Sequence, residues 1–407
     1  MSKEKLLEGI RELTPLLFAI TAVCWLSFFL VQPFDGNKSD FPQYYTPARL
    51  IMTGHGADIY DVKKVSEFER ECFPSMGERV LPIYLPPPSQ AWFLPLGLLP
   101  PNIASIVWRV VQATAMIASL LLLKSSFQLS RKSFLWLIAV LCASGPAFAA
   151  FQIEQVSVLL LCALSTAIWG FKKDKPWVTA VALAFLMLKP QEGIPLLVYL
   201  AGARKYKQLA MTIAILFIIS ILACVLIGYQ SVINYVTFAY SSVENSGFNQ
   251  SELGPTVRGQ LLRLFPDSKS PIAIVSIMVF LATSVFIYLS GRRFASNKAW
   301  LEAGLLIAVP LGLVTCFHLH SYDLTLLAPT VVVLMAGPLE AAIPPVALLA
   351  SFLLLGSLMI PFYIFIHHNF LLTDHWILNP HFFVVLAFSI GTAFLAYRYP
   401  DRLSNQP

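Results

Sequence analysis

Residues 39–56 read SDFPQYYTPARLIMTGHG, and this stretch comes directly after the first long apolar run of the chain, at residues 13–32. The stretch is too polar to lie within lipid, so it marks the point where the chain leaves an apolar helix. Its apolar residues recur at helical spacing: Phe41, Tyr44, Tyr45, Ala48 and Ile51. This spacing predicts a short amphipathic helix along a membrane surface, with Asp40 at its start. The alternative for Asp40 is a helix N-cap, with Pro42 in the first turn.

The composition is that of a membrane protein. Of the 407 residues, 57% are hydrophobic and 12% are charged, and the mean hydropathy is +0.71. Soluble globular proteins carry about 25% charged residues. We therefore predict an all-α polytopic membrane protein that forms one integral domain over residues 1–407. The net charge of +6 is modest and lies in alternate loops, which gives no support to nucleic-acid binding.

Long apolar runs follow one another along the whole chain. They lie near residues 13–32, 102–123, 134–150, 155–171, 177–188, 191–201, 208–228, 271–290, 300–317, 322–336, 343–366 and 381–397. The runs at 177–188 and 191–201 are shorter than the roughly 20 residues that a straight span needs, and we interpret them as two thin spans. The sequence thus predicts a bundle of about twelve transmembrane helices, with both termini on the same side.

Basic residues indicate which side that is. More than half of the 28 lysines and arginines fall at the N-terminus, at the C-terminus or in the short loops on the same side: Lys3, Lys5, Arg11, Lys124, Arg131, Lys132, Lys172, Lys173, Lys175, Arg204, Lys205, Lys207, Arg292, Arg293, Lys298, Arg398 and Arg402. The positive-inside rule makes this side cytoplasmic. Two long segments, 33–101 and 229–270, are then external, and the first is expected to carry amphipathic helices. We predict a multi-pass protein of the bacterial cytoplasmic (inner) membrane.

The same topology gathers the polar candidates on the external face. They are Asp40, Glu154, Gln155, Lys189, Asn249, Arg258, His318, His320 and Asp323. Ionisable residues at membrane ends are costly and are functional candidates by default. A carboxylate could deprotonate an attacking hydroxyl, while Lys189, Arg258 and the two histidines could hold an anionic phosphate as it leaves. A base opposite a leaving group gives inversion at the transferred carbon.

Each candidate also has a structural explanation. Lys189 could snorkel from a helix end, and Arg258 could be a solvated loop residue. If the segment from His318 to His320 were helical, the two rings would point in different directions and at most one would face a given ligand. Asp323 could cap the next helix or orient a histidine, and Glu154 could serve within the bundle.

Several of these segments together resemble glycosyltransferase family 87, enzymes that use polyprenyl-phosphate sugars. The resemblance lies in Asp40-Phe41, Tyr44-Tyr45, Ala48, Gly54, Tyr60-Asp61, Tyr84 to Pro88, Gln155-Val156-Ser157, Lys189-Pro190, Asn249 with Ser251, Arg258, and His320 to Asp323. It implies a GT-C type bundle, a lipid-phosphate donor in place of a nucleotide sugar, and no required metal. Two positions depart from the pattern: Glu154 stands where a glycine is expected, and His318 is an extra histidine.

Carried over by position, the resemblance makes Asp40 the catalytic base and His320, Lys189 and Arg258 the donor-phosphate contacts, with His318 beside them. The acceptor and sugar contacts are expected among Tyr44, Tyr45, Glu154, Gln155, Asn249 and Asp323. No cofactor or metal is expected, although the sequence leaves a divalent ion near Asp40 and Glu154 open.

The leading hypothesis is an inverting glycosyltransferase that moves a hexose, with mannose expected, from polyprenyl phosphate to a lipid or glycan acceptor outside the cytoplasmic membrane. Its partners would be that donor, that acceptor and membrane lipids, without nucleic acid. A lipid-linked oligosaccharide ligase or polymerase is the second hypothesis. The third is a transporter or flippase, which the absence of an apparent inverted repeat in the sequence disfavours.

Overall fold

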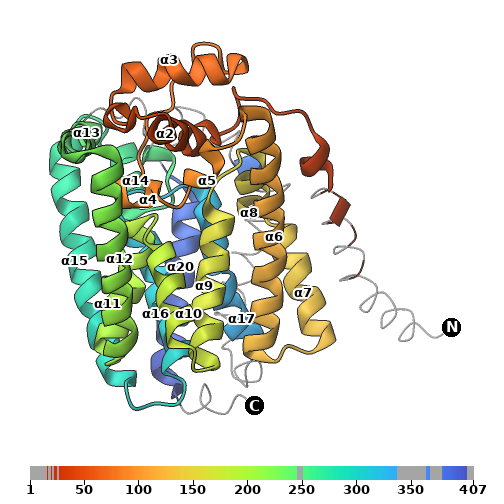
Figure 1. Ribbon diagram of the computed structural model, residues 1–407. Helices are drawn as coiled ribbons and strands as arrows, with labels where there is room; N and C mark the ends of the chain where they lie inside the picture. The colour runs from red at the N-terminus through yellow and green to blue at the C-terminus, as the bar shows by residue number, and fades with distance from the viewer. Residues whose placement is uncertain are drawn as a thin grey trace.

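The structure is a computed structural model, and it describes residues 16, 20, 23–24, 27–244, 251–336, 364–366 and 378–400. Within these residues all regular structure is helical and no strand occurs, as the apolar runs predict. The elements form a bundle of long helices with a cap of short helices at one end (Figure 1). Half of the run at 13–32 and all of the run at 343–366 except residues 364–366 lie outside the described residues.

The bundle follows the predicted runs closely. Its helices are α6 (Pro101–Phe127), α7 (Arg131–Cys142), α8 (Gly145–Gln152), α9 (Ser157–Lys172), α10 (Pro176–Leu186), α11 (Pro190–Gly202), α12 (Tyr206–Ile227), α15 (Lys269–Phe294), α16 (Trp300–Thr315), α17 (Ala328–Ala336) and α20 (Pro380–Arg398). Four of them, α6, α12, α15 and α20, are long and apolar enough to cross a membrane. The number of twelve spans stays a prediction.

One predicted run is divided. Residues 134–150 do not form one helix, because α7 ends at Cys142 and α8 begins at Gly145. The hydroxyl of Ser144 accepts a hydrogen bond from the backbone N–H of Ala147, and Pro146 stands in the first turn of α8. A capping serine followed by a proline is a helix start, so it interrupts the run even though the apolar composition continues.

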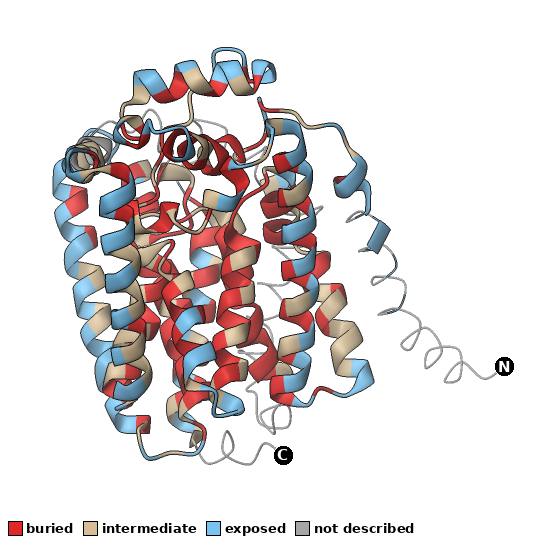
Figure 2. Ribbon diagram, in the orientation of Figure 1, coloured by how far each residue is buried: buried red, intermediate tan, exposed pale blue. Residues whose placement is uncertain are grey.

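The outward faces of the bundle are apolar. Side chains of α12 and α15 such as Phe217, Ile218, Met278 and Val285 are more than half exposed. Figure 2 shows the same contrast, with exposed outer faces on α12 and α15 and buried residues through the centre. Exposed apolar faces on long helices are what lipid tails cover, so the helices indicate a membrane protein.

Two glycines allow a close backbone contact between α11 and α15. A Cβ built on Gly202 of α11 would lie 2.1 Å from the carbonyl oxygen of Tyr288 in α15, and one on Gly291 would lie 2.3 Å from that of Tyr199. These positions require glycine because the two backbones touch.

The cap is built from the two long segments that the sequence predicts to be external, 33–101 and 229–270. It contains α2 (Pro42–Met52), η1 (Gly56–Asp58), α3 (Val62–Cys72), η2 (Pro74–Met76), α4 (Pro87–Gln90), α5 (Leu94–Gly97), α13 (Tyr229–Glu244), η3 (Ser251–Leu253) and α14 (Val257–Leu264). The remaining short element, η4 (Ser321–Leu327), leads into α17. Figure 1 shows α2 and α3 across one end of the bundle, while the loops joining α6 to α7 and α15 to α16 lie at the other end.

The amphipathic helix predicted after Asp40 is present as α2. Phe41, Tyr44, Tyr45 and Ala48 are each at most 1% exposed. The three aromatic rings pack against Phe73, Phe93 and Trp108, so this apolar face is buried within the protein, whereas the sequence predicted that it would lie along a membrane surface. A second helix in the segment that was expected to carry amphipathic helices is α3, which is rich in charged residues. The three prolines at 86–88 differ in conformation: Pro86 is extended, whereas Pro87 and Pro88 form the start of α4. Proline has no N–H to lose in a first helical turn.

Candidate active site

Asp40 is fixed at the junction between the cap and the bundle. Its backbone N–H donates to the carbonyl of Ile153, 2.7 Å away, in the loop between α8 and α9. Phe41 is the N-cap residue of α2, which makes no side-chain cap hydrogen bond. The Asp40 carboxylate is therefore not the N-cap that the alternative interpretation required, and it is directed to other partners.

Those partners hold both carboxylate oxygens. The Arg79 guanidinium donates to Oδ1 of Asp40 at 2.6 Å, and the amide nitrogen of Gln155 donates to Oδ2 at 2.5 Å. Gln155 accepts in turn from the hydroxyl of Tyr44 at 2.5 Å. Burial and then the charge of Asp40 raise the pKa of Tyr44 well above its usual range, so this phenol is a donor at neutral pH.

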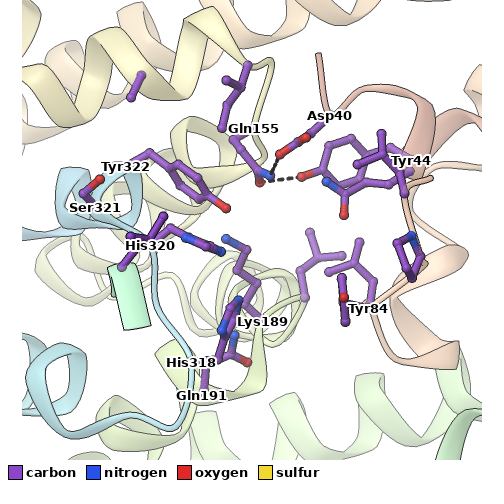
Figure 3. Close-up of a pocket in the computed structure, with 18 of the residues that line it drawn as sticks. Asp40, Tyr44, Tyr84, Gln155, Lys189, Gln191, His318, His320, Ser321 and Tyr322 are labelled. Carbon is purple, nitrogen blue, oxygen red and sulfur yellow. Dashed lines mark hydrogen bonds between the residues drawn. The ribbon is translucent and has the colours of Figure 1, made fainter. Parts of the chain in front are cut away.

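Asp40 faces a cavity of about 930 Å³ beneath the cap. The polar side chains that line it are those of Asp40, Gln43, Tyr44, Arg79, Tyr84, Gln152, Gln155, Lys189, Gln191, Tyr235, His318, His320, Ser321 and Tyr322. Figure 3 shows Asp40 and Gln155 on one side of this space, with His320, Lys189 and His318 across from them. A single carboxylate therefore lines the same hollow as a lysine and two histidines from distant parts of the chain.

Lys189 is held by carboxylates behind the cavity wall. Its ammonium group lies 2.6 Å from Oδ1 of Asp323 and 3.6 Å from Oε1 of Glu192. Asp323 also accepts from the Ser157 hydroxyl and from the backbone N–H of His320. Burial lowers the pKa of Lys189, but the charges of Asp323 and Glu192 outweigh it, so that the net shift is upward and the ammonium stays charged.

Both histidines line the cavity, and the segment that carries them is not helical. His320 has φ −106° and ψ 162°, and Leu319 between the rings is 1% exposed. Leu319 packs into the core between the two residues whose rings line the cavity. The helical alternative, in which at most one ring would face a ligand, does not occur. The ring centroids lie 4.7 Å apart.

Burial lowers the pKa of both histidines. For His318 the charges of His320, Lys189 and Arg258 add to the effect, and the pKa falls well below its usual range. For His320, Asp323 opposes the effect without cancelling it. On their own, both rings are therefore neutral at pH 7, and an arriving anion would favour their protonation.

Arg258 supports the site from behind the wall. Its side chain is buried, donates to the hydroxyl of Ser251 at 2.9 Å, and lies 3.9 Å from the centre of the Phe317 ring. Ser251 is 3.3 Å from Nδ1 of His318. Burial lowers the pKa of Arg258 to about 10. Arg258 is thus neither a solvated loop residue nor part of the cavity lining, and it acts on His318 through Ser251.

Glu154 stands on backbone that favours glycine. Its φ is +58°, in the left-handed region. The side chain that replaces glycine's hydrogen pairs with buried Arg109 and accepts from the hydroxyl of Ser39 at 2.5 Å. Burial raises the pKa of Glu154, while Ser39 and Arg109 act against it. Glu154 does not line the cavity, and it contacts the residue that precedes Asp40.

The remaining sequence candidates differ in their position relative to the cavity. Tyr44 and Gln155 line the cavity, whereas Tyr45 donates from its hydroxyl to the carbonyl of Leu99 and does not. Asp323 forms the cap of η4 with His320, which is the structural alternative considered for it from the sequence. Asn249 lies outside the described residues.

Arg79, Gln191 and Tyr322 line the cavity and were not singled out from the sequence. Gln191 and Tyr322 adjoin residues that were, and this adjacency could have indicated them. Arg79 had no such neighbour, since it lies among the charged residues that follow α3.

In the described part of the chain, a helical bundle with apolar outer faces indicates a membrane protein, and its cavity beneath the cap is lined by both charged and apolar side chains. The chain belongs to glycosyltransferase family 87, whose family model matches residues 84–339. The matched region contains the lysine and histidine side of the cavity, while Asp40 and Arg79 precede it. No curated protein and no solved structure matches the chain.

Proposed function

We propose that this glycosyltransferase moves a hexose, with mannose expected, from a polyprenyl-phosphate donor to a lipid or glycan acceptor, with inversion at the transferred carbon. One observation carries the proposal: Asp40 and the set of Lys189, His318 and His320 line one cavity (Figure 3). A base and an anion-binding set in one hollow fit a single displacement at a sugar carbon between them.

In this reaction Asp40 takes the proton of the acceptor hydroxyl. The acceptor oxygen forms a bond to the anomeric carbon as the bond from that carbon to the phosphate oxygen breaks. The electron pair of the broken bond stays on the phosphate, which gains a negative charge. Lys189 and the two histidines stabilise that charge where it develops, and electrostatic stabilisation of this kind usually contributes more to catalysis than any other single effect.

The cavity wall beside the cations suits a lipid-linked donor. Ile194 of α11, Tyr235 of α13 and Phe280 of α15 line the cavity. The outer face of α15 carries exposed apolar side chains. An isoprenoid tail would leave the cavity past these helices and enter the bilayer, which explains why an enzyme that acts on a sugar is built from apolar helices.

The side beside Asp40 suits a polyol acceptor. Gln43 and Gln152 line this part of the cavity. Amide groups pair well with sugar hydroxyls because they offer hydrogen-bonding groups in fixed directions. These residues take the place of Tyr45 and Glu154 in the proposed acceptor contacts, because those two side chains are engaged elsewhere.

We place the site outside the bacterial cytoplasmic membrane, with both termini in the cytoplasm. Loops rich in lysine and arginine lie at the end of the bundle opposite α2 and α3, which supports this orientation (Figure 1). No group of three or more His, Cys, Asp or Glu in the described part of the chain could hold a metal ion. A reaction without a cofactor stays a prediction.

The test is a transfer assay with the purified protein in lipid nanodiscs. Radiolabelled polyprenyl-phosphate mannose, glucose and galactose are each supplied with lipid and soluble glycan acceptors. We expect a labelled glycoside and released polyprenyl phosphate in equal amounts. Transfer only from a diphosphate-linked donor would instead support the ligase or polymerase. Substrate flux across vesicles without a covalent product would support a transporter.

A further inference from the structure

Arg79 makes three hydrogen bonds that converge on the Asp40 segment. One terminal nitrogen donates to the carbonyls of Gly36 at 3.1 Å and Ser39 at 2.6 Å, and the other donates to Oδ1 of Asp40 at 2.6 Å. The planar guanidinium therefore bridges the backbone before Asp40 and its side chain at once. A lysine has a single charged nitrogen and cannot hold all three acceptors in this geometry.

The segment that carries Arg79 is fixed from both sides. It leaves a turn at Gly77, where φ is +58°, and residues 79–82 line the cavity. The backbone N–H of Leu81 donates to the carboxylate of Glu69 in α3. A short segment between α3 and α4 thus places the guanidinium of Arg79 against Asp40. The Arg79 side chain is 27% exposed.

We propose that Arg79 is the positioning residue of the reaction, which fixes the orientation of Asp40 toward the acceptor hydroxyl. This inference rests on the proposed function. The contacts explain why Asp40 does not cap α2: its two oxygens are drawn to Arg79 and Gln155, toward the cavity. Displacing a reacting group by about 1 Å costs about 100-fold in rate, so the position of this carboxylate matters as much as its identity.

Charge and geometry can be separated by two substitutions. Arg79→Met removes both the positive charge and the bridge, whereas Arg79→Lys keeps the charge and loses the bridge. A carboxylate that loses a neighbouring cation titrates at higher pH. Among the described residues, the other titratable groups that interact with the charge of Asp40 include Tyr44, Glu69, Glu154, His320 and Tyr322, and both variants leave these side chains unchanged. Burial raises the pKa of Glu69 and the charge of Arg79 opposes this, so Arg79→Met acts on that buried carboxyl as well. Arg70→Met is the control, because Arg70 is an exposed arginine of α3 that does not line the cavity.

The experiment measures kcat and KM for hexose transfer against pH in the unaltered protein, Arg79→Met, Arg79→Lys and Arg70→Met. We expect Arg79→Met to lower kcat about 100-fold with the donor KM unchanged, and to move the acidic limb of the kcat profile to higher pH. Arg79→Lys should lower kcat without moving that limb, and Arg70→Met should match the unaltered protein.

If Arg79→Met does not fold, Arg79→Lys still tests the inference. Its kcat should be lower than that of the unaltered protein, and the acidic limb of its pH profile should stay at the same pH. Added guanidinium should also raise the activity of Arg79→Ala. An unaltered protein that transfers sugar while the Arg79 variants behave like Arg70→Met would overturn this inference and leave the proposed function standing. No transfer by the unaltered protein would overturn both.

Discussion

The side-chain amide of Gln155 donates a hydrogen bond of 2.5 Å from Nε2 to Oδ2 of Asp40, across 115 residues of sequence. The same amide accepts from the Tyr44 hydroxyl, so its orientation is fixed. This chain of contacts joins α2 of the cap to the start of α9 in the bundle. The cavity thus depends on the docking of the cap onto the bundle.

The Gln155 contact can be tested by a substitution of nearly equal shape. In Gln155→Glu a second carboxylate would face Asp40, and two carboxylates in contact cannot both ionise readily. We expect kcat to fall at neutral pH and the acidic limb of its pH profile to move upward. Rate measurements across pH check this. Gln208→Glu, at the far end of α12, is the control. An unchanged profile in Gln155→Glu would show that Asp40 does not titrate in the reaction.

The lowered pKa values of the two histidines predict how the stability of the folded protein changes with pH. Burial depresses their pKa in the folded protein below the ordinary 6.5 of the unfolded chain. The unfolded state therefore binds more protons as the pH falls below about 6.5, and the protein without donor loses stability there. A bound donor supplies a negative charge that lets the rings protonate. Its phosphodiester does not titrate in this range, so the donor should stabilise the protein more at about pH 5.5 than at about pH 8.

Thermal unfolding with and without polyprenyl-phosphate mannose measures this difference. The double variant His318→Gln, His320→Gln should lose the pH dependence while it keeps the fold. Equal stabilisation by the donor at both pH values in the unaltered protein would contradict a role for the histidines in holding the phosphate.

Glu154 offers a test of stability that does not depend on activity. Glu154→Gly relieves the left-handed backbone, worth about 1–2 kcal/mol, but leaves the Arg109 charge buried without its partner, which costs about 3–5 kcal/mol. We expect a net loss of about 2 kcal/mol, seen as a lower unfolding midpoint. Adding Arg109→Met should recover most of it. A single variant as stable as the parent would show that the ion pair contributes no more than the roughly 1–2 kcal/mol recovered from the backbone.

The sequence predicted the long helices well because each is one apolar run bounded by polar or helix-breaking residues. The expected run at 208–228 is α12, and the charged stretch after Asp61 is α3 with Asp61 as its N-cap. The run at 134–150 failed as one helix because a local cap at Ser144 overrides composition. Composition reports burial in lipid, whereas helix ends depend on individual hydrogen bonds.

The site was predictable by residue type more than by geometry. Asp40, Lys189 and the histidines were gathered on one face by topology alone. The pairing of Asp40 with Arg79 depends on the path of the segment between α3 and α4, and no hydrophobic periodicity in the sequence predicts that path. The non-helical conformation of His318 to His320 and the left-handed backbone at Glu154 are likewise set by tertiary contacts. The glycine that the family resemblance leads one to expect at position 154 was the one indication of the left-handed backbone there.

The most direct test of the proposed mechanism is hexose transfer by Asp40→Asn, measured as labelled glycoside formed from polyprenyl-phosphate mannose. Asparagine keeps the shape of the side chain but cannot take a proton at neutral pH. Asp58→Asn, on the partly exposed η1 helix, is the control. We predict that Asp40→Asn still gains stability from the donor but forms less product by at least about 100-fold. Transfer by Asp40→Asn at the rate of the unaltered protein would contradict the mechanism.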